Sequence, residues 1–147
     1  MAGSKRDNFE NDILEHIFQN ANIADIGDGT GLRGSSAAGN LYLALYTVAP
    51  TDSTAGTECT YTGYARVGVA RTAGGWTVTT NNASNTAAVT FGQCTVGSQT
   101  AVAFAICKGD VETTDDQIYW GDLTANLAIS PGITPEFAIG DIDVNED

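Results

Sequence analysis

The stretch from Leu41 to Val48, LYLALYTV, is the strongest constraint that this sequence places on its fold. It carries no charge, and its leucines alternate with Tyr42, Ala44, Tyr46 and Val48, so both faces of an extended strand would be largely apolar. Such a strand must be covered on both sides. Gly39-Asn40 and Pro50 supply turn signals at its two ends, and the stretch is far shorter than the roughly 20 residues of a membrane helix. We therefore expect the central strand of a β core.

Several further segments alternate with period two between clusters of Gly, Asn and Pro. We predict strands at 64–71, 76–79, 87–91, 101–106, 118–123 and 136–144, with a turn at 81–85. The first of these is expected to keep one face, which includes Arg66, in water. In the last, the apolar phase slips at Gly140-Asp141, which favours a β-bulge. The pattern predicts an all-β fold, an antiparallel β-sandwich of about seven to eight short strands.

One amphipathic helix is predicted near the N-terminus. Asp7 and Glu10 have the spacing of a capping box, and one apolar stripe follows, made by Phe9, Ile13, Leu14, Ile17 and Phe18, with the acidic residues, Glu10 included, toward water. Residues 20–40 form a polar loop whose apolar anchors are Ile23, Ile26 and Leu32. A loop of this length tends to be functional or to order on contact with a partner.

The length of 147 residues suits one compact domain, with a helix and contact arm at 1–40 and a β-sandwich at 41–147. The formal net charge of −12 argues against direct nucleic-acid binding, because phosphates require clustered Lys and Arg. No apolar run typical of a signal peptide stands near the N-terminus, so we expect neither secretion nor a membrane anchor. The protein is then expected to be made in a cytoplasm.

The residues that could bind a ligand or catalyse a reaction do not form a convincing motif. Gly29–Gly34 matches G-x-G-x-x-G, but it follows a helix and precedes a strand, the reverse of a dinucleotide-binding turn. Any Ser- or Cys-based catalytic site would depend on His16, the one histidine, which we expect to be a partly exposed helix residue. The loop acids lack the register of a calcium loop and are expected to be solvated: Asp25, Asp28, Asp110, Asp115 and Asp116.

Three cysteines, Cys59, Cys94 and Cys107, are an odd number without metal-ligand spacing. We expect free thiols, and a bridge within or between subunits of an assembly stays open. The sequence thus predicts no catalytic residue, no cofactor and no metal, and we expect a protein that is not an enzyme.

Several segments together resemble a family of small tailed-bacteriophage structural proteins, of the tail-fibre and head-decoration type. They are DNFENDILEHIF, LRGSSAAGNLYLALYT, GYAR, WTVTTNNASNTAAVTF and TPEFAIGDIDV. The resemblance covers nearly the whole chain and carries no catalytic signature. It implies a non-enzymatic virion component that contacts other virion proteins, either the major capsid protein or tail proteins.

Capsid decoration is the first expectation from this resemblance, because a compact chain without a shaft repeat suits clamping of neighbouring capsid subunits. The alternative is a tail-fibre or tail-tip module that binds the host surface, marked by exposed aromatics among Trp76, Trp120, Tyr61 and Tyr64. A homo-oligomer is expected, a trimer by analogy. The candidate docking residues are Phe9, Ile13, Leu14, Ile17, Phe18, Ile23, Ile26, Leu32 and Arg33.

Overall fold

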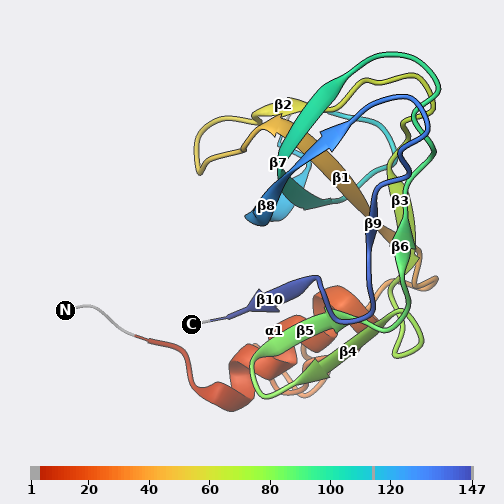
Figure 1. Ribbon diagram of the computed structural model, residues 1–147. Helices are drawn as coiled ribbons and strands as arrows, with labels where there is room; N and C mark the ends of the chain where they lie inside the picture. Colours follow the sequence, from red (N-terminus) through yellow and green to blue (C-terminus); the bar gives the residue numbers. More distant parts are fainter. Residues whose placement is uncertain (1–3, 114, 147) are drawn as a thin grey trace. The chain divides into compact units, whose positions relative to one another are not determined.

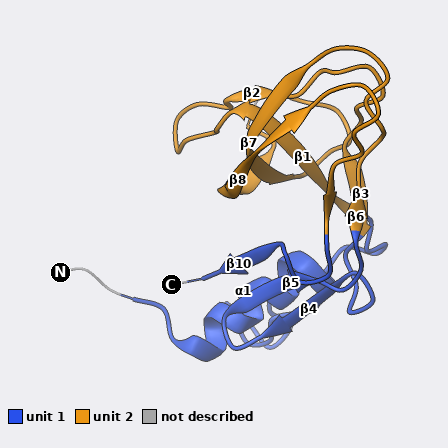
Figure 2. Cartoon of the chain, in the orientation of Figure 1, with its two compact units in different colours: residues 1–39, 70–88, 138–147 blue, residues 40–69, 89–137 orange. Residues whose placement is uncertain are grey.

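The computed structural model describes residues 4–113 and 115–146, within which it has one helix and ten strands (Figure 1). Contacts divide the chain into two compact units (Figure 2). Unit 1 comprises residues 1–39, 70–88 and 138–147, and unit 2 comprises residues 40–69 and 89–137. In unit 1, strands from the middle and the end of the chain pack with the N-terminal helix.

Unit 2 contains an antiparallel sheet in the order β2-β1-β7-β8, with β3 also paired to β1. Its strands are β1 (Asn40–Val48), β2 (Thr57–Glu58), β3 (Val67–Ala70), β7 (Gln99–Cys107) and β8 (Gln117–Ile129). A separate two-stranded ladder joins β6 (Val89–Thr90) to β9 (Glu136–Phe137). The antiparallel, sandwich-like all-β class predicted from the sequence is confirmed, with ten strands among the described residues in place of seven to eight.

The expected central strand is confirmed. In β1, Leu43 and Leu45 on one face and Ala44 and Tyr46 on the other are all essentially inaccessible to solvent. One face packs against the β6-β9 ladder through aromatic rings, since the centroids of Phe104 and Phe137 lie 5.6 Å apart. Each fully buried large apolar side chain contributes about 1.5–3 kcal/mol of transfer free energy, so the two strands β1 and β7 account for much of the stability of this unit.

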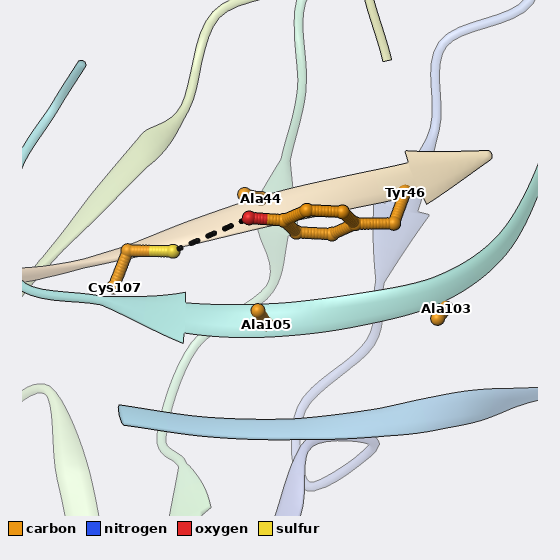
Figure 3. Packing of buried hydrophobic residues seen from close by; sticks show 5 residues of the cluster. All are labelled: Ala44, Tyr46, Ala103, Ala105 and Cys107. Atoms are coloured by element: carbon orange, nitrogen blue, oxygen red, sulfur yellow. Dashed lines mark hydrogen bonds between the residues drawn. The ribbon is translucent and has the colours of Figure 1, made fainter. Parts of the chain in front are cut away.

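The opposite face of the same sheet is lined by small residues. Ala44, Ala103 and Ala105 are fully buried there, and the ring of Tyr46 extends over Ala44 toward Cys107 (Figure 3). Cross-strand pairing places Ala44 opposite Ala105 and Tyr46 opposite Ala103. The alanines leave the room that the Tyr46 ring occupies.

Unit 1 packs α1 (Asp7–Gln19) against a sheet in the order β10-β5-β4. Its strands are β4 (Trp76–Thr79), β5 (Asn82–Asn85) and β10 (Asp143–Asn145). Leu14 and Phe18 of the helix are fully buried, and the Phe18 ring meets the Trp76 ring edge-on at 4.7 Å. Near the two ends of this unit's chain, Lys5 Nζ lies 2.8 Å from Glu146 Oε2. The predicted amphipathic helix is therefore confirmed, and it packs within its own chain.

Arg71 satisfies the C-terminal end of α1. Its Nε donates to the Ile17 carbonyl at 2.6 Å and its Nη2 to the His16 carbonyl at 2.8 Å. These carbonyls belong to the last turn, whose acceptors have no partner within the helix, and a cation there also favours the helix dipole. Asn20 then ends the helix in the left-handed region with φ of 58°.

The start of the helix differs from the prediction. Arg6, in an extended conformation, is the N-cap residue, and it makes no side-chain capping bond. Its carbonyl accepts hydrogen bonds from the amides of Phe9 and Glu10. Asp7 therefore lies inside the first turn, where its charge favours the positive end of the helix, and no capping box with Glu10 forms. Glu10, expected in water, is buried.

Two predictions near the C-terminal half are also wrong in detail. The expected strand 136–144 is two strands, because β9 belongs to unit 2 and β10 to unit 1. The alternation of apolar residues shifts by one position where the chain passes from unit 2 to unit 1. A turn lies there, in which the Asp141 amide donates to the Ala138 carbonyl. The expected turn 81–85 contains β5, and the actual turn is Thr80-Asn81, both with positive φ.

No helix within the described ranges combines the length and apolar character that crossing a membrane requires.

Candidate functional site

Unit 2 contains a buried ionic cluster, here called the Arg66 cluster, made by Glu58, Arg66 and Asp116. Their side chains are only 6%, 2% and 3% exposed. Arg66 grips Glu58 with two parallel bonds, Nε to Oε1 at 2.9 Å and Nη2 to Oε2 at 2.8 Å. Its Nη1 donates to Asp116 Oδ2 and, at 2.9 Å, to the Gly109 carbonyl. One guanidinium thus serves two carboxylates and the loop between β7 and β8.

The cluster is linked to the central strand by Tyr64. The Tyr64 hydroxyl donates to Glu58 Oε1 at 2.6 Å and accepts from the Leu45 amide at 3.0 Å. Burial, reinforced by the bond to Glu58, raises the Tyr64 pKa well above its ordinary range. For Arg66, burial acts to lower the pKa, but the bonds to Glu58 and Asp116 outweigh it and the pKa is raised. The buried guanidinium is therefore held in its charged form.

A second polar chain runs across the small-residue face. Gln117 Nε2 donates to the Tyr46 hydroxyl at 2.9 Å, and that hydroxyl lies 3.9 Å from Cys107 Sγ (Figure 3). Burial raises the Tyr46 pKa above its usual range and raises that of Cys107 to about 12. Burial likewise raises the pKa of Cys59 to about 11. These groups are held neutral by burial, and Tyr46 and Cys107 act as structural hydrogen-bonding partners.

The raised pKa values predict that stability falls in alkali. Below pH 9 the thiols of Cys59 and Cys107 are neutral in both the folded and the unfolded chain. Above that pH the unfolded chain loses its thiol protons first, so the free energy of unfolding declines until the folded pKa values near 11 and 12 are reached. Urea unfolding between pH 8 and pH 11 measures the slope. The variant Cys107→Ala is expected to reduce the slope of the free energy of unfolding against pH, with Cys59 still contributing. An unchanged slope would show that the Cys107 thiol does not cause the loss of stability.

A polar pocket of about 330 Å³ adjoins this region within unit 2. Residues 50–55, in the loop between β1 and β2, form one side, and residues at the start of β8 form the other. Thr51 and Asp52 offer a hydroxyl and a carboxylate, Asp115 a second carboxylate, and Trp120 an indole that is 42% exposed. The pocket therefore combines hydrogen-bonding groups with one apolar surface.

Both walls of the pocket are held in place by hydrogen bonds. Thr51 and Thr54 exchange backbone bonds at 2.9 and 3.3 Å, and their hydroxyl oxygens lie 2.8 Å apart. On the other wall, Gln117 is fixed by Tyr46, and Asp116, between Asp115 and Gln117, is anchored by Arg66. The pocket is thus pre-organised by hydrogen bonds within residues 51–54 and by the anchoring of Asp116 and Gln117.

The predicted docking residues all lie in unit 1 and divide by exposure. Leu14, Phe18 and Ile23 are buried in the core of that unit, and Ile13 and Ile17 are half-buried. The exposed members are Phe9, Ile26, Leu32 and Arg33. Leu32 is brought beside Ile23 by two backbone bonds of 2.8 and 2.9 Å, which close the contact loop on itself. A docking role for the exposed members remains a prediction.

Of the four aromatics singled out in the sequence, only Trp120 is exposed. Trp76 and Tyr61 are buried and Tyr64 is half-buried. His16 is half-buried and its Nδ1 donates to the Ala21 carbonyl at 2.6 Å, while the three cysteines are free and buried. Within the part of the chain that the structure describes, no three His, Cys, Asp or Glu side chains are grouped to hold a metal ion.

The sequence interpretation missed the Arg66 cluster. Arg66 was expected in water on the 64–71 strand, and Asp116 was expected to be a solvated loop acid, yet both are buried. The partners stand 8 and 50 positions from Arg66 along the chain, so no local pattern pairs them. The usable signal is the position of Arg66 in YARVGVA, a segment otherwise made of apolar and small residues.

Comparison with known proteins agrees with the resemblance seen in the sequence. The family described as Podophage GP4 fiber I protein gp80 matches residues 5–145, nearly the whole chain. No curated protein matches it. The family is one of tailed-phage structural proteins, which places this protein in the virion. The chain belongs to the family of the Podophage GP4 fiber I protein gp80.

Proposed function

We propose that this chain is a non-enzymatic subunit of the podophage fibre. The observation that supports the proposal is the family match, which spans residues 5–145 and whose description names a fibre. Capsid decoration was the first expectation from the sequence, and the family description favours the alternative, a tail-fibre module. In this role the chain contacts other virion proteins and forms a homo-oligomer.

The chemistry of unit 2 supports a structural role. Arg66, Glu58 and Asp116 are engaged with one another inside the unit, and the Cys59 and Cys107 thiols are kept protonated by burial, which raises their pKa values. A nucleophile needs an accessible position and an activating base. The buried groups instead join the loop at Gly109 and Asp116 to the central sheet.

We place the attachment surface of the subunit on the exposed apolar residues of the N-terminal helix and the loop that follows it, within residues 1–40. Phe9, Ile26 and Leu32 are 38–45% exposed, and Arg33, next to Leu32 in the sequence, adds an exposed cation. The double variant Phe9→Asp, Leu32→Asp is expected to leave circular dichroism unchanged and to cut incorporation into particles at least tenfold. Ile139→Asp, at a residue 69% exposed in the same unit, is the matched control. Normal incorporation of the double variant would refute this surface.

Labelling of intact particles tests the proposed function itself. A peptide tag inserted after Gly132, an exposed turn residue at which an added side chain would meet no neighbour, is detected with gold-conjugated antibody by electron microscopy. Gold on the fibres supports the proposal. Gold spread over the head overturns it in favour of capsid decoration, which binding of the purified protein to empty heads would then corroborate.

A further inference from the structure

We propose that the pocket between residues 50–55 and the start of β8 binds an uncharged hexopyranose unit of a surface glycan. The proposal rests on the proposed fibre function for its biological setting, and on the geometry of the pocket for its chemistry. The pocket volume of about 330 Å³ lies at the small end of ligand pockets, which span roughly 300–1,000 Å³. It therefore suits one sugar ring.

Trp120 provides the apolar surface that a sugar ring requires. A pyranose has one face made mainly of C–H groups, and this face packs on an aromatic ring. The hydroxyl groups at the edge of the sugar then need polar partners. Trp120 is 42% exposed, whereas Trp76 is fully buried. It pairs with Ala105 across β7 and β8, and it lines the pocket. Its exposed indole therefore gives this wall an apolar surface beside the polar groups of Asp115 and Gln117.

The polar lining selects for hydroxyl groups without charge. Asp52 and Asp115 are exposed carboxylates that accept hydrogen bonds from sugar hydroxyls, while Thr54 offers a hydroxyl that both donates and accepts. The same carboxylates repel an anionic sugar, and the formal net charge of −12 adds to that repulsion. Uronic acids and phosphorylated sugars are therefore excluded as ligands.

The rigidity of the walls favours binding by a small ligand. Residues 51–54 form a hydrogen-bonded turn, and the Arg66 and Tyr46 bonds fix the chain on either side of Asp115. Binding to a pocket that is already ordered loses little conformational entropy of the protein. This saving matters most for a small ligand, whose affinity is only about millimolar.

The two tryptophans provide a direct test with the full-length protein. After labelling with 5-fluorotryptophan, Trp120 and Trp76 give separate fluorine resonances, assigned with Trp120→Phe. The probes are methyl α-glucoside, methyl α-mannoside and methyl β-galactoside, with glucuronate as the anionic control. At least one neutral glycoside is expected to shift the Trp120 resonance at millimolar concentration while Trp76 stays unchanged. Trp120→Ala and Asp115→Asn are each expected to weaken binding about tenfold.

Three results would overturn the proposal. They are no shift of Trp120 with any neutral glycoside, equal shifts of both tryptophans, and equal binding of glucuronate. Particles that carry Trp120→Ala provide an independent readout, because they should incorporate the subunit normally and adsorb to host cells less than particles that carry Ile139→Ala. If gold labels the fibres but no glycoside binds, only the proposed sugar site is refuted. If a glycoside binds but gold labels the heads, only the proposed fibre function is refuted.

Discussion

Replacement of Arg66 by leucine is expected to lower the free energy of unfolding of unit 2 by about 3–5 kcal/mol. The variant removes both bonds to Glu58 and the bond to Asp116, and it leaves two carboxylates buried without a counter-ion. Because desolvation of an unpaired charge costs several kcal/mol, this is the largest effect that we expect from a single substitution in this unit. Urea unfolding followed by circular dichroism measures it.

Two further variants separate the charge effect from a general loss of arginine. Arg33→Leu makes the same chemical change at an exposed loop position and is expected to alter stability by no more than about 0.5 kcal/mol. Glu58→Gln and Asp116→Asn, added to Arg66→Leu, remove the two stranded charges and should recover part of the loss. If Arg66→Leu alone is as stable as the wild type, the cluster does not hold unit 2 together.

Trp76→Ala is expected to destabilise unit 1 by about 3–5 kcal/mol, the usual cost of a large aromatic cavity. Trp76 is fully buried and meets Phe18 at 4.7 Å, so its loss uncouples α1 from β4. Trp76→Phe should cost less, because the Trp76 Nε1 has no hydrogen-bond partner among the described residues. Hydrogen exchange followed by mass spectrometry reads the change in α1 and β4 directly.

Trp120→Ala is the matched control, since it makes the same substitution at a residue that is 42% exposed. We expect a loss of about 1 kcal/mol or less. Faster exchange in Trp76→Ala confined to unit 1 would indicate that the two units open independently. Equal costs for Trp76→Ala and Trp120→Ala would contradict the core assigned to unit 1.

The sequence predicted the elements whose pattern is local. The doubly apolar LYLALYTV is β1, the alternation at 76–79 is β4, and the stripe from Ile13 to Phe18 is the buried side of α1. In each case, periodicity reports burial directly. It failed at β5, because the Asn-rich segment 82–85 has the composition of a turn, and pairing with β4 and β10 overrides that preference.

The candidate sites were less accessible to sequence reasoning, for a different reason. Trp120 was correctly included among the possible exposed aromatics. The sequence could not show that Trp120 is exposed and Trp76 buried, because this depends on which face of its strand each residue occupies. The pocket joins residues 50–55 to residues 115–120, and the Arg66 cluster joins three segments. Contacts between distant segments are set by strand pairing, and a single sequence carries no local trace of which acid will meet which base.

The Lys5–Glu146 ion pair gives the molecule a mechanical property. Both ends of the described chain lie in unit 1, where β10 pairs with β5 in an antiparallel ladder. Tension applied at residues 5 and 146 would be transmitted across unit 1 alone, and β10 would be the first strand to peel away. Every segment of unit 2 is joined at both ends to unit 1. A subunit pulled at residues 5 and 146 would therefore open first in unit 1, while the pocket in unit 2 kept its shape.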